Sequence, residues 1–132
     1  MSDIKEAEIT HQVANITLTT TTETVIVTSP KVTLPFHTCR TIILAWGQLT
    51  TGTGTTAVTP RIRRGTGTGD PLVGEANAEQ IKVAAGNTEP FFICVSEFLE
   101  GRESVQYSFT LAQAGATADG SCLQASILVL IL

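Results

Sequence analysis

Residues 61–71, RIRRGTGTGDP, combine a cluster of arginines with alternating glycines, a composition that could hold a phosphate group. A Walker loop needs a lysine and then a serine or threonine after its last glycine, to bind phosphates and magnesium. In this chain Asp70 and Pro71 follow Gly69. A dinucleotide site needs a helix whose N-terminus meets the pyrophosphate, and no helical pattern follows Pro71. We therefore predict a loop tip here and not a phosphate site.

The arginines of this segment suggest a second chemistry, ion pairing. On a strand, Arg61 and Arg63 share one face while Ile62 points to the other. Solvated strand arginines are the simpler interpretation. The alternative is a patch of Arg61, Arg63 and Arg64 that docks an acidic partner, because guanidinium groups bind carboxylates in a matching fork geometry. The chain has only eight Lys and Arg residues, so this cluster is a local concentration of positive charge.

Histidine and carboxylate chemistry has little support. His11 and His37 are the only imidazoles, and neither lies in a metal-binding or triad-like pattern. Glu97, Glu100 and Glu103 could pair as in a glycoside hydrolase or bind calcium, but a solvated acidic turn explains them more simply. The sequence predicts no enzyme, no metal ion and no cofactor.

The cysteines Cys39, Cys94 and Cys122 lie far apart, with no C-x-x-C pair and no nearby histidine, so a zinc site is not expected. We expect small buried side chains on strands. One disulfide with a leftover thiol stays open as an alternative.

Aromatic residues are scarce, with one Trp and one Tyr. Sugar-binding surfaces of β-sandwiches commonly stack pyranose rings on exposed aromatic side chains, so this scarcity argues against a carbohydrate-binding module. Trp46 shares a strand face with Ile42 and Leu44, and we predict that it is a core residue.

Composition limits the partners. A formal charge of −4 argues against nucleic-acid binding. The opening MSDIKEAEIT has no apolar signal core, and no apolar run is long enough to cross a bilayer. Hydrophobic residues make up 42% of the chain and charged residues only 15%, which is unusually apolar for a small monomer. We expect a soluble chain with a protein partner and no membrane or nucleic-acid contact.

The elements that position these residues are strands, because Thr, Val and Ile recur throughout. In residues 103–112, ESVQYSFTLA, apolar and polar side chains alternate, so we predict a strand with one wet face. Further strands are predicted at 14–19, 23–28, 40–49, 57–63, 79–85, 90–98 and 123–131. About eight strands with turn clusters between them predict an all-β, single-domain sandwich or barrel. Residues 74–80 could add a helical turn. Residues 1–12 form an N-terminal arm or frayed terminus, and residues 13–132 the β-sandwich domain.

The last predicted strand is apolar on both faces. Alternation puts Leu128, Leu130 and Leu132 on the side opposite Ile127 and Val129. A strand of this kind is covered on both sides. It lies either in the centre of one sandwich or against a second copy of the chain, with the three leucines as the oligomer interface.

The short, acidic, Thr-rich chain, with its ending QYSFTLAQAGATADGSCLQASILVLIL, resembles the small jelly-roll decoration (cement) proteins of bacteriophage capsids. The resemblance is one of strand spacing over most of the chain. It implies a jelly-roll sandwich of antiparallel strands that forms a homotrimer. It also implies a virion location, on the outer capsid surface, after synthesis in the host cytoplasm. The trimer would bridge subunits of the major capsid protein and stabilise the shell.

On this resemblance, residues 1–12 would reach the capsid or an adjacent trimer, and Arg61, Arg63 and Arg64 would contribute to capsid docking. The alternative is a receptor- or glycan-binding jelly-roll head of a phage fibre or a TNF-like module, which also forms trimers.

Overall fold

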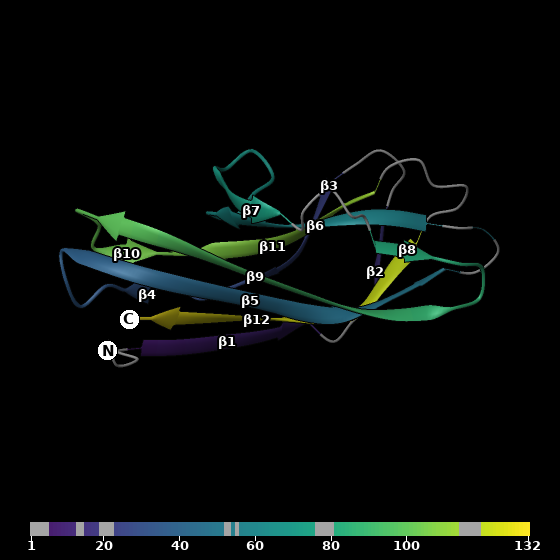
Figure 1. The fold of residues 1–132 in the computed structure, drawn as a ribbon, viewed down its shortest axis with the longest axis horizontal. Helices are drawn as coiled ribbons and strands as arrows, with labels where there is room; N and C mark the ends of the chain where they lie inside the picture. The colour runs from purple at the N-terminus through teal and green to yellow at the C-terminus, as the bar shows by residue number, and fades with distance from the viewer. Residues whose placement is uncertain are drawn as a thin grey trace.

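The Thr- and Val-rich sequence forms strands and turns, and no helix, in the part of the chain that the structure describes (Figure 1). The structure is a computed structural model, and it describes residues 6–12, 15–18, 23–51, 54, 56–75, 81–113 and 120–132. The strands are β1 (Glu6–Gln12), β2 (Ile16–Thr17), β3 (Glu23–Thr28), β4 (Val32–Thr33), β5 (Thr38–Thr51), β6 (Thr56–Arg64), β7 (Leu72–Glu75), β8 (Ile81–Val83), β9 (Thr88–Glu100), β10 (Ser104–Val105), β11 (Tyr107–Gln113) and β12 (Gly120–Ile131).

The strands assemble into two main sheets, and every described pairing is antiparallel. Sheet A has the order β1-β12-β5-β9, with β2 beside β12. Sheet B has the order β3-β11-β6-β7, with β8 beside β6. A short third pair joins β4 to β10. The result is the predicted all-β, single-domain β-sandwich of jelly-roll type.

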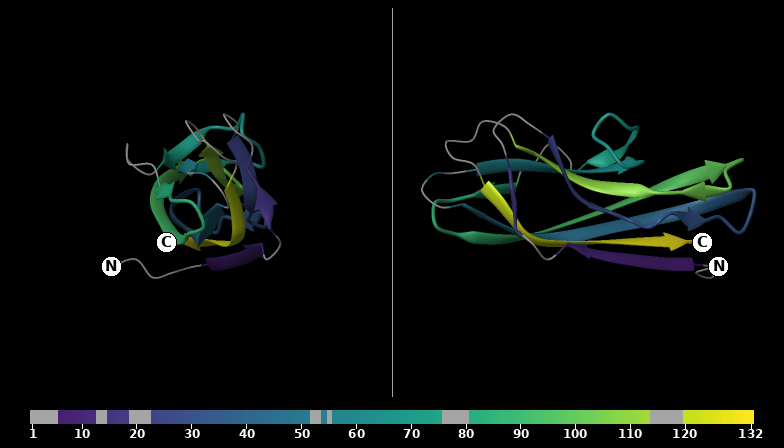
Figure 2. Two further views of the ribbon diagram at one scale, coloured as in Figure 1. Left: turned by 90° about the vertical axis from the view of Figure 1, so that its right-hand side faces the viewer. Right: turned by 180° about the vertical axis from the view of Figure 1, so that it is seen from behind.

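The core lies between the two sheets, which enclose it when the molecule is seen end on (Figure 2). Phe91 of sheet A stacks on Phe109 of sheet B, with ring centroids 5.3 Å apart. The same core cluster contains the fully buried side chains of Ile43, Ile62, Leu111 and Ile127. In the C-terminal strand, Ile127, Val129 and Ile131 point into the core, as the alternation predicts.

The long predicted strands are confirmed, with somewhat wider bounds, and several short ones were not predicted. β5, β9 and β12 extend beyond the predicted 40–49, 90–98 and 123–131. The predicted strand 79–85 is β8, which covers Ile81–Val83, and the predicted strand 103–112 is divided into β10 and β11; β4 and β7 are additions. The helical turn considered over residues 74–80 lies largely outside the described residues.

The N-terminal segment contains a strand that the sequence analysis did not predict. Residues Glu6–Gln12 form β1, which pairs with β12 along its whole length, and the two strands run side by side in both views (Figure 1, Figure 2). The segment EAEITHQ alternates only weakly between apolar and polar residues. An edge strand with many polar residues has no clear apolar period, so this strand was not recognised in the sequence. An arm over residues 1–12 that contacts a partner stays a prediction.

One face of β11 is buried, although the sequence analysis expected it to be exposed to solvent. Ser108 and Thr110 are both fully buried. β11 lies between β3 and β6, and Glu23 of β3 forms ion pairs with Arg61 and Arg63 of β6. These long side chains therefore cross over β11 and cover its small hydroxyl residues, a long-range contact that strand alternation cannot reveal.

Candidate assembly surfaces

The side of sheet A that points away from the core carries apolar side chains on four neighbouring strands, and we call it the outer face. Residues paired in an antiparallel ladder point to the same side of the sheet, so the register arranges the outer face in rows. The three central rows are Ala7-Leu130-Ile42-Ser96, Ile9-Leu128-Leu44-Cys94 and His11-Ser126-Trp46-Phe92. None of these positions carries Asp, Glu, Lys or Arg, so hydration of charged groups does not stabilise this surface in water.

The predicted interface residues lie on this outer face or beside it. Leu128 and Leu130 occupy its centre and are partly exposed, and Leu132 follows at the end of β12, with its backbone N–H donating to the carbonyl of Arg40. The sequence analysis missed the residues on the flanking strands, among them Ile9 and Leu44. The sequence did indicate a second apolar face on β5, because residues 42–46, IILAW, are apolar at odd and even positions alike, just as β12 is.

The outer face is large enough to matter for association. Phe92 and Phe98 are each 61% exposed, and Ile9 is 48% exposed. Four strands about 4.8 Å apart, over eight residues that rise about 3.4 Å each, give a flat area of roughly 500 Å². A contact that covers one such face and an equal area of a partner would bury on the order of 1,000 Å², which is near the lower bound for a specific protein interface.

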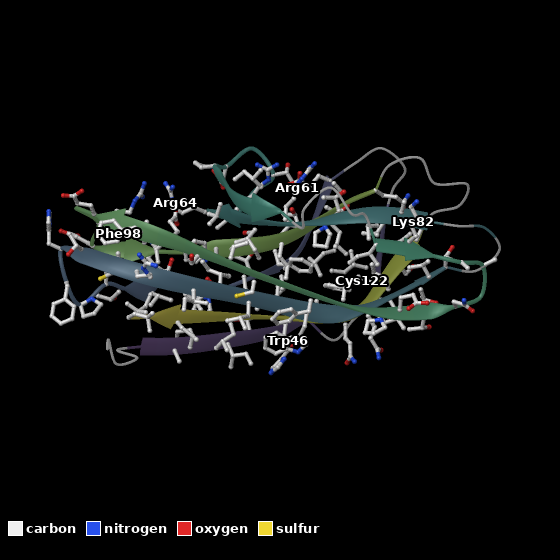
Figure 3. All side chains as sticks on the ribbon, viewed as in Figure 1. Trp46, Arg61, Arg64, Lys82, Phe98 and Cys122 are labelled. Atoms are coloured by element: carbon white, nitrogen blue, oxygen red, sulfur yellow. The ribbon has the colours of Figure 1, made fainter. Side chains whose placement is uncertain are left out.

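Trp46 lies on the outer face, so the prediction that it is a core residue is wrong. It does share a face with Ile42 and Leu44, as the alternation predicts. That face points away from sheet B, and Figure 3 shows the Trp46 side chain pointing out of the sandwich. An apolar run on one side of a strand resembles a core in sequence, because only the tertiary structure decides which side is covered.

The cysteines divide into two kinds. Cys39 and Cys122 are free and buried, as predicted, whereas Cys94 is free and exposed, so its predicted burial is wrong. Burial raises the pKa of Cys122 to about 11, which keeps it a thiol at neutral pH. Cys94 is exposed because β9 is the edge strand of sheet A and residue 94 points to the outer face.

Arg61 and Arg63 of the arginine cluster lie on the outside of sheet B and share a carboxylate partner within the chain. Arg61 donates from Nη1 to Oε1 of Glu23 at 2.6 Å, and Arg63 donates from Nε to Oε2 at 2.5 Å and from Nη2 to Oε1 at 2.9 Å. The hydrogen bonds from Arg63, reinforced by Arg61, lower the pKa of Glu23 to about 2 despite its partial burial. Arg61 and Arg63 share a face opposite buried Ile62, as predicted.

Arg64 belongs to a different set of contacts, which joins the two sheets. It donates from Nε and Nη2 to Oε1 of Glu97 on β9, at 2.9 and 2.5 Å. The hydroxyl of Tyr107 on β11 donates to Oε2 of Glu97 at 2.8 Å, and the Thr41 hydroxyl on β5 lies 2.7 Å from the Tyr107 oxygen. Because the Tyr107 proton is used on Glu97, Thr41 is the donor to Tyr107. Burial, the largest cause, raises the pKa of Tyr107, so the phenol stays protonated.

The glycine-rich loop is closed on itself. The backbone N–H groups of Thr66 and Gly67 donate to Oδ2 of Asp70 at 2.8 and 2.9 Å. Arg63 donates from Nη1 to the Asp70 carbonyl at 2.8 Å. Two adjacent N–H groups of this kind could hold an anion, and here the chain's own carboxylate occupies them. This geometry agrees with the loop tip that the sequence predicted.

The remaining candidate residues do not come together as a reactive centre. His37, Glu100 and Glu103 are exposed at one end of the molecule, while Glu97 is held by Arg64 and Tyr107. Within the ranges that the structure describes, no three His, Cys, Asp or Glu side chains lie close enough together to hold a metal ion. Over the same ranges there is no helix that could span a membrane.

The fold and its surfaces define a jelly-roll β-sandwich with one apolar outer face, and the same fold occurs in virus particles. A structure of infectious bursal disease virus, Gx strain, matches 96% of this chain with a TM-score of 0.57 at 10% identity. The T13 particle of that virus matches 98% with a TM-score of 0.57 at 6% identity, and its T=1 particle matches 100% with 0.54 at 9% identity.

This chain spans about a third of the length of those viral chains, 32% to 33%. The likeness at these identities shows a shared fold. No protein-family model matches the chain, and no curated protein matches it in sequence.

Proposed function

We propose that this chain is a non-enzymatic structural protein of a virion, which binds the outer capsid surface as a homotrimer and stabilises the shell as a decoration (cement) protein. It would be made in the host cytoplasm and would contact copies of itself and the major capsid protein. The similarity of fold to chains of a virus particle supports the virion role. The bacteriophage setting and the trimer rest on the resemblance in strand spacing.

The observation that carries the proposal is the apolar outer face of sheet A. Antiparallel sheets often leave one side in water, and that side is then polar. Here the row through Leu128 is apolar or cysteine from β1 to β9, and the row through Leu130 is apolar from β1 to β5. A contiguous apolar surface of this extent marks a contact site on a soluble protein. A second copy of the chain is the natural partner, since it brings a surface with the same character.

The arginine cluster is the proposed docking site for the capsid. Arg61 and Arg63 keep part of their side chains accessible, 29% and 15%, although Glu23 binds both. An acidic capsid side chain would add to this cluster rather than replace Glu23. Arg64, 25% accessible beside Glu97, would contribute from the adjacent end of β6.

The first experiment is the mass of the purified protein in solution, by light scattering after size exclusion. A trimer is expected, at three times the 14.0 kDa of one chain. Leu128→Glu, which puts a charge in the centre of the outer face, should shift the protein to monomer. Thr59→Glu, a change of the same kind on the outside of sheet B, is the matched control and should leave the assembly intact.

A stable wild-type monomer at all concentrations would overturn the self-association part of the proposal. Capsid docking is tested separately, by sedimenting the protein with decoration-free capsids. Charge reversal at Arg61 and Arg63 should abolish co-sedimentation without changing the solution mass. Co-sedimentation that survives charge reversal would refute the arginine site, and survival after deletion of residues 1–12 would refute the N-terminal arm.

A further inference from the structure

A hollow of about 460 Å³ lies on the outer face, at the end away from Leu130. Its side chains come from four strands of sheet A and include Trp46, Gln48, Gln124, His11, Ser126 and Pro90. Leu128, Leu130 and Leu132 do not line it. The hollow shares Trp46, His11 and Ser126 with the outer face, but it lies beside the three leucines of the proposed assembly and is more polar than they are.

The hollow forms where the sheet bends. The register between β12 and β5 shifts between Cys122 and Gln124, a β-bulge, which bends a strand locally. Gly47 is paired with Ala125, next to this bulge, and a Cβ there would lie 2.2 Å from the carbonyl oxygen of Gln124 and 2.8 Å from the Phe91 ring. Glycine is thus required for this close approach of β5 to β12. The bend leaves Trp46 and the two glutamine side chains around a depression instead of on a flat sheet.

The polar groups of the hollow are uncharged carboxamides, a hydroxyl and an imidazole. Gln124 donates from Nε2 to Oε1 of Gln48 at 3.5 Å, a long hydrogen bond that a ligand could replace. His11 Nδ1 lies 2.5 Å from the Ser126 hydroxyl, which fixes the imidazole. In the described part of the chain, the other imidazole nitrogen of His11 has no hydrogen-bond partner.

This combination selects a class of ligand. No Asp, Glu, Lys or Arg lines the hollow, so a charged ligand would find no counter-charge. The carboxamides can both donate and accept hydrogen bonds, which suits hydroxyl groups that do the same. The indole of Trp46 supplies a flat apolar platform, and the exposed ring of Phe92 lies directly across from it on β9. Pockets for small ligands combine these features, an apolar wall and a few convergent polar groups.

We propose that this hollow binds a neutral saccharide, with a sugar ring stacked on Trp46 and its hydroxyl groups hydrogen-bonded to Gln48, Gln124 and His11. The scarcity of aromatic residues argued against sugar binding at the level of sequence. That argument loses its force because the single tryptophan lies at the surface, beside the polar groups that a sugar needs. A saccharide site on a virion protein would let the particle adsorb to a glycan-bearing surface.

The single tryptophan makes the test direct, because fluorescence reports on this site alone. The protein is titrated with cellohexaose, xylohexaose, chitohexaose, maltohexaose and a galacto-oligosaccharide, up to millimolar concentration. At least one probe should change Trp46 emission with a saturable dependence. Gln48→Ala with Gln124→Ala should weaken that binding about tenfold or more, because two hydrogen bonds are lost. Lys82→Ala, on the far sheet, should leave it unchanged.

Calorimetry of Trp46→Ala gives an independent readout, with loss of binding expected and circular dichroism confirming the fold. The titration is repeated in Leu128→Glu, where binding should persist even if assembly is lost, so the two proposals fail separately. If no probe changes the emission or releases heat in either background, the saccharide site is refuted. Binding that survives the double glutamine change would equally overturn the assignment of the hollow.

Discussion

At the scale of single residues, Glu23 is the most consequential charged group in the described part of the chain. It bridges Arg61 and Arg63 over the central strand of sheet B, and its pKa is lowered to about 2 from an ordinary 4.5. A carboxyl with a depressed folded-state pKa stabilises the fold above its unfolded pKa. That contribution is lost as the pH falls through the folded value. The window of loss is therefore about pH 4.5 to 2.

We predict that Glu23→Gln lowers the free energy of unfolding by about 1–3 kcal/mol at neutral pH, because two arginines lose the negative charge and one of the two acceptor oxygens. The deficit relative to wild type should shrink from pH 4.5 toward pH 2, where wild-type Glu23 becomes protonated. Urea unfolding at pH 7 and pH 3 measures both values. Glu103→Gln, at an exposed position, is the control. A deficit that is equal at both pH values would contradict the ion-pair account.

The glycine loop gives a second residue-scale prediction. Gly65 has a φ of 138°, and a Cβ there would lie 2.2 Å from Oδ2 of Asp70. Gly65→Ala should therefore destabilise the protein by about 1–3 kcal/mol. Gly69→Ala is a matched control in the same loop, since nothing lies within 4 Å of its added Cβ, and it should be close to neutral. Equal thermal stabilities of the two variants would show that the position of Asp70 does not matter for the stability of the loop.

At the scale of strands, the Thr41–Tyr107–Glu97–Arg64 contacts join β5 and β9 of sheet A to β11 and β6 of sheet B. Tyr107→Phe keeps the buried ring and removes the hydroxyl that links Thr41 to Glu97. We predict a loss of about 1–3 kcal/mol in unfolding free energy, because Oε2 of Glu97 loses its donor, although Thr41 keeps its hydrogen bond to the Glu97 carbonyl at 3.3 Å. Thr33→Ala, at an exposed position, is the control for denaturant unfolding. A Tyr107→Phe variant as stable as wild type would mean that these contacts contribute little to holding the sheets together.

At the scale of the whole molecule, the exposed thiol reports on whether the outer face is covered. Cys94 should react with a thiol reagent in the folded protein, whereas Cys39 and Cys122 should react only after unfolding. Under the assembly proposal, Cys94 labelling should slow as protein concentration rises, and a bulky maleimide on Cys94 should block association. Leu128→Glu should restore fast labelling at every concentration. A labelling rate independent of concentration in the wild type would argue that the outer face stays in water.

The class of fold and the alternation of faces along its long strands could be predicted from the sequence. β-branched composition, turn clusters and alternation predicted an all-β sandwich, the burial of Tyr107 and Phe109, and the opposite orientations of Ile127 and Leu128, because these depend on local geometry. It also excluded a phosphate loop at Gly69.

The tertiary structure decided which side of each apolar strand is covered. It placed Trp46 and Cys94 outside, buried Ser108 beneath the Arg–Glu23 pairs, and brought His11 to Gln124 and Trp46. These outcomes depend on contacts between residues far apart in the chain. The alternation of apolar and polar residues within one strand does not show which other element covers each of its faces.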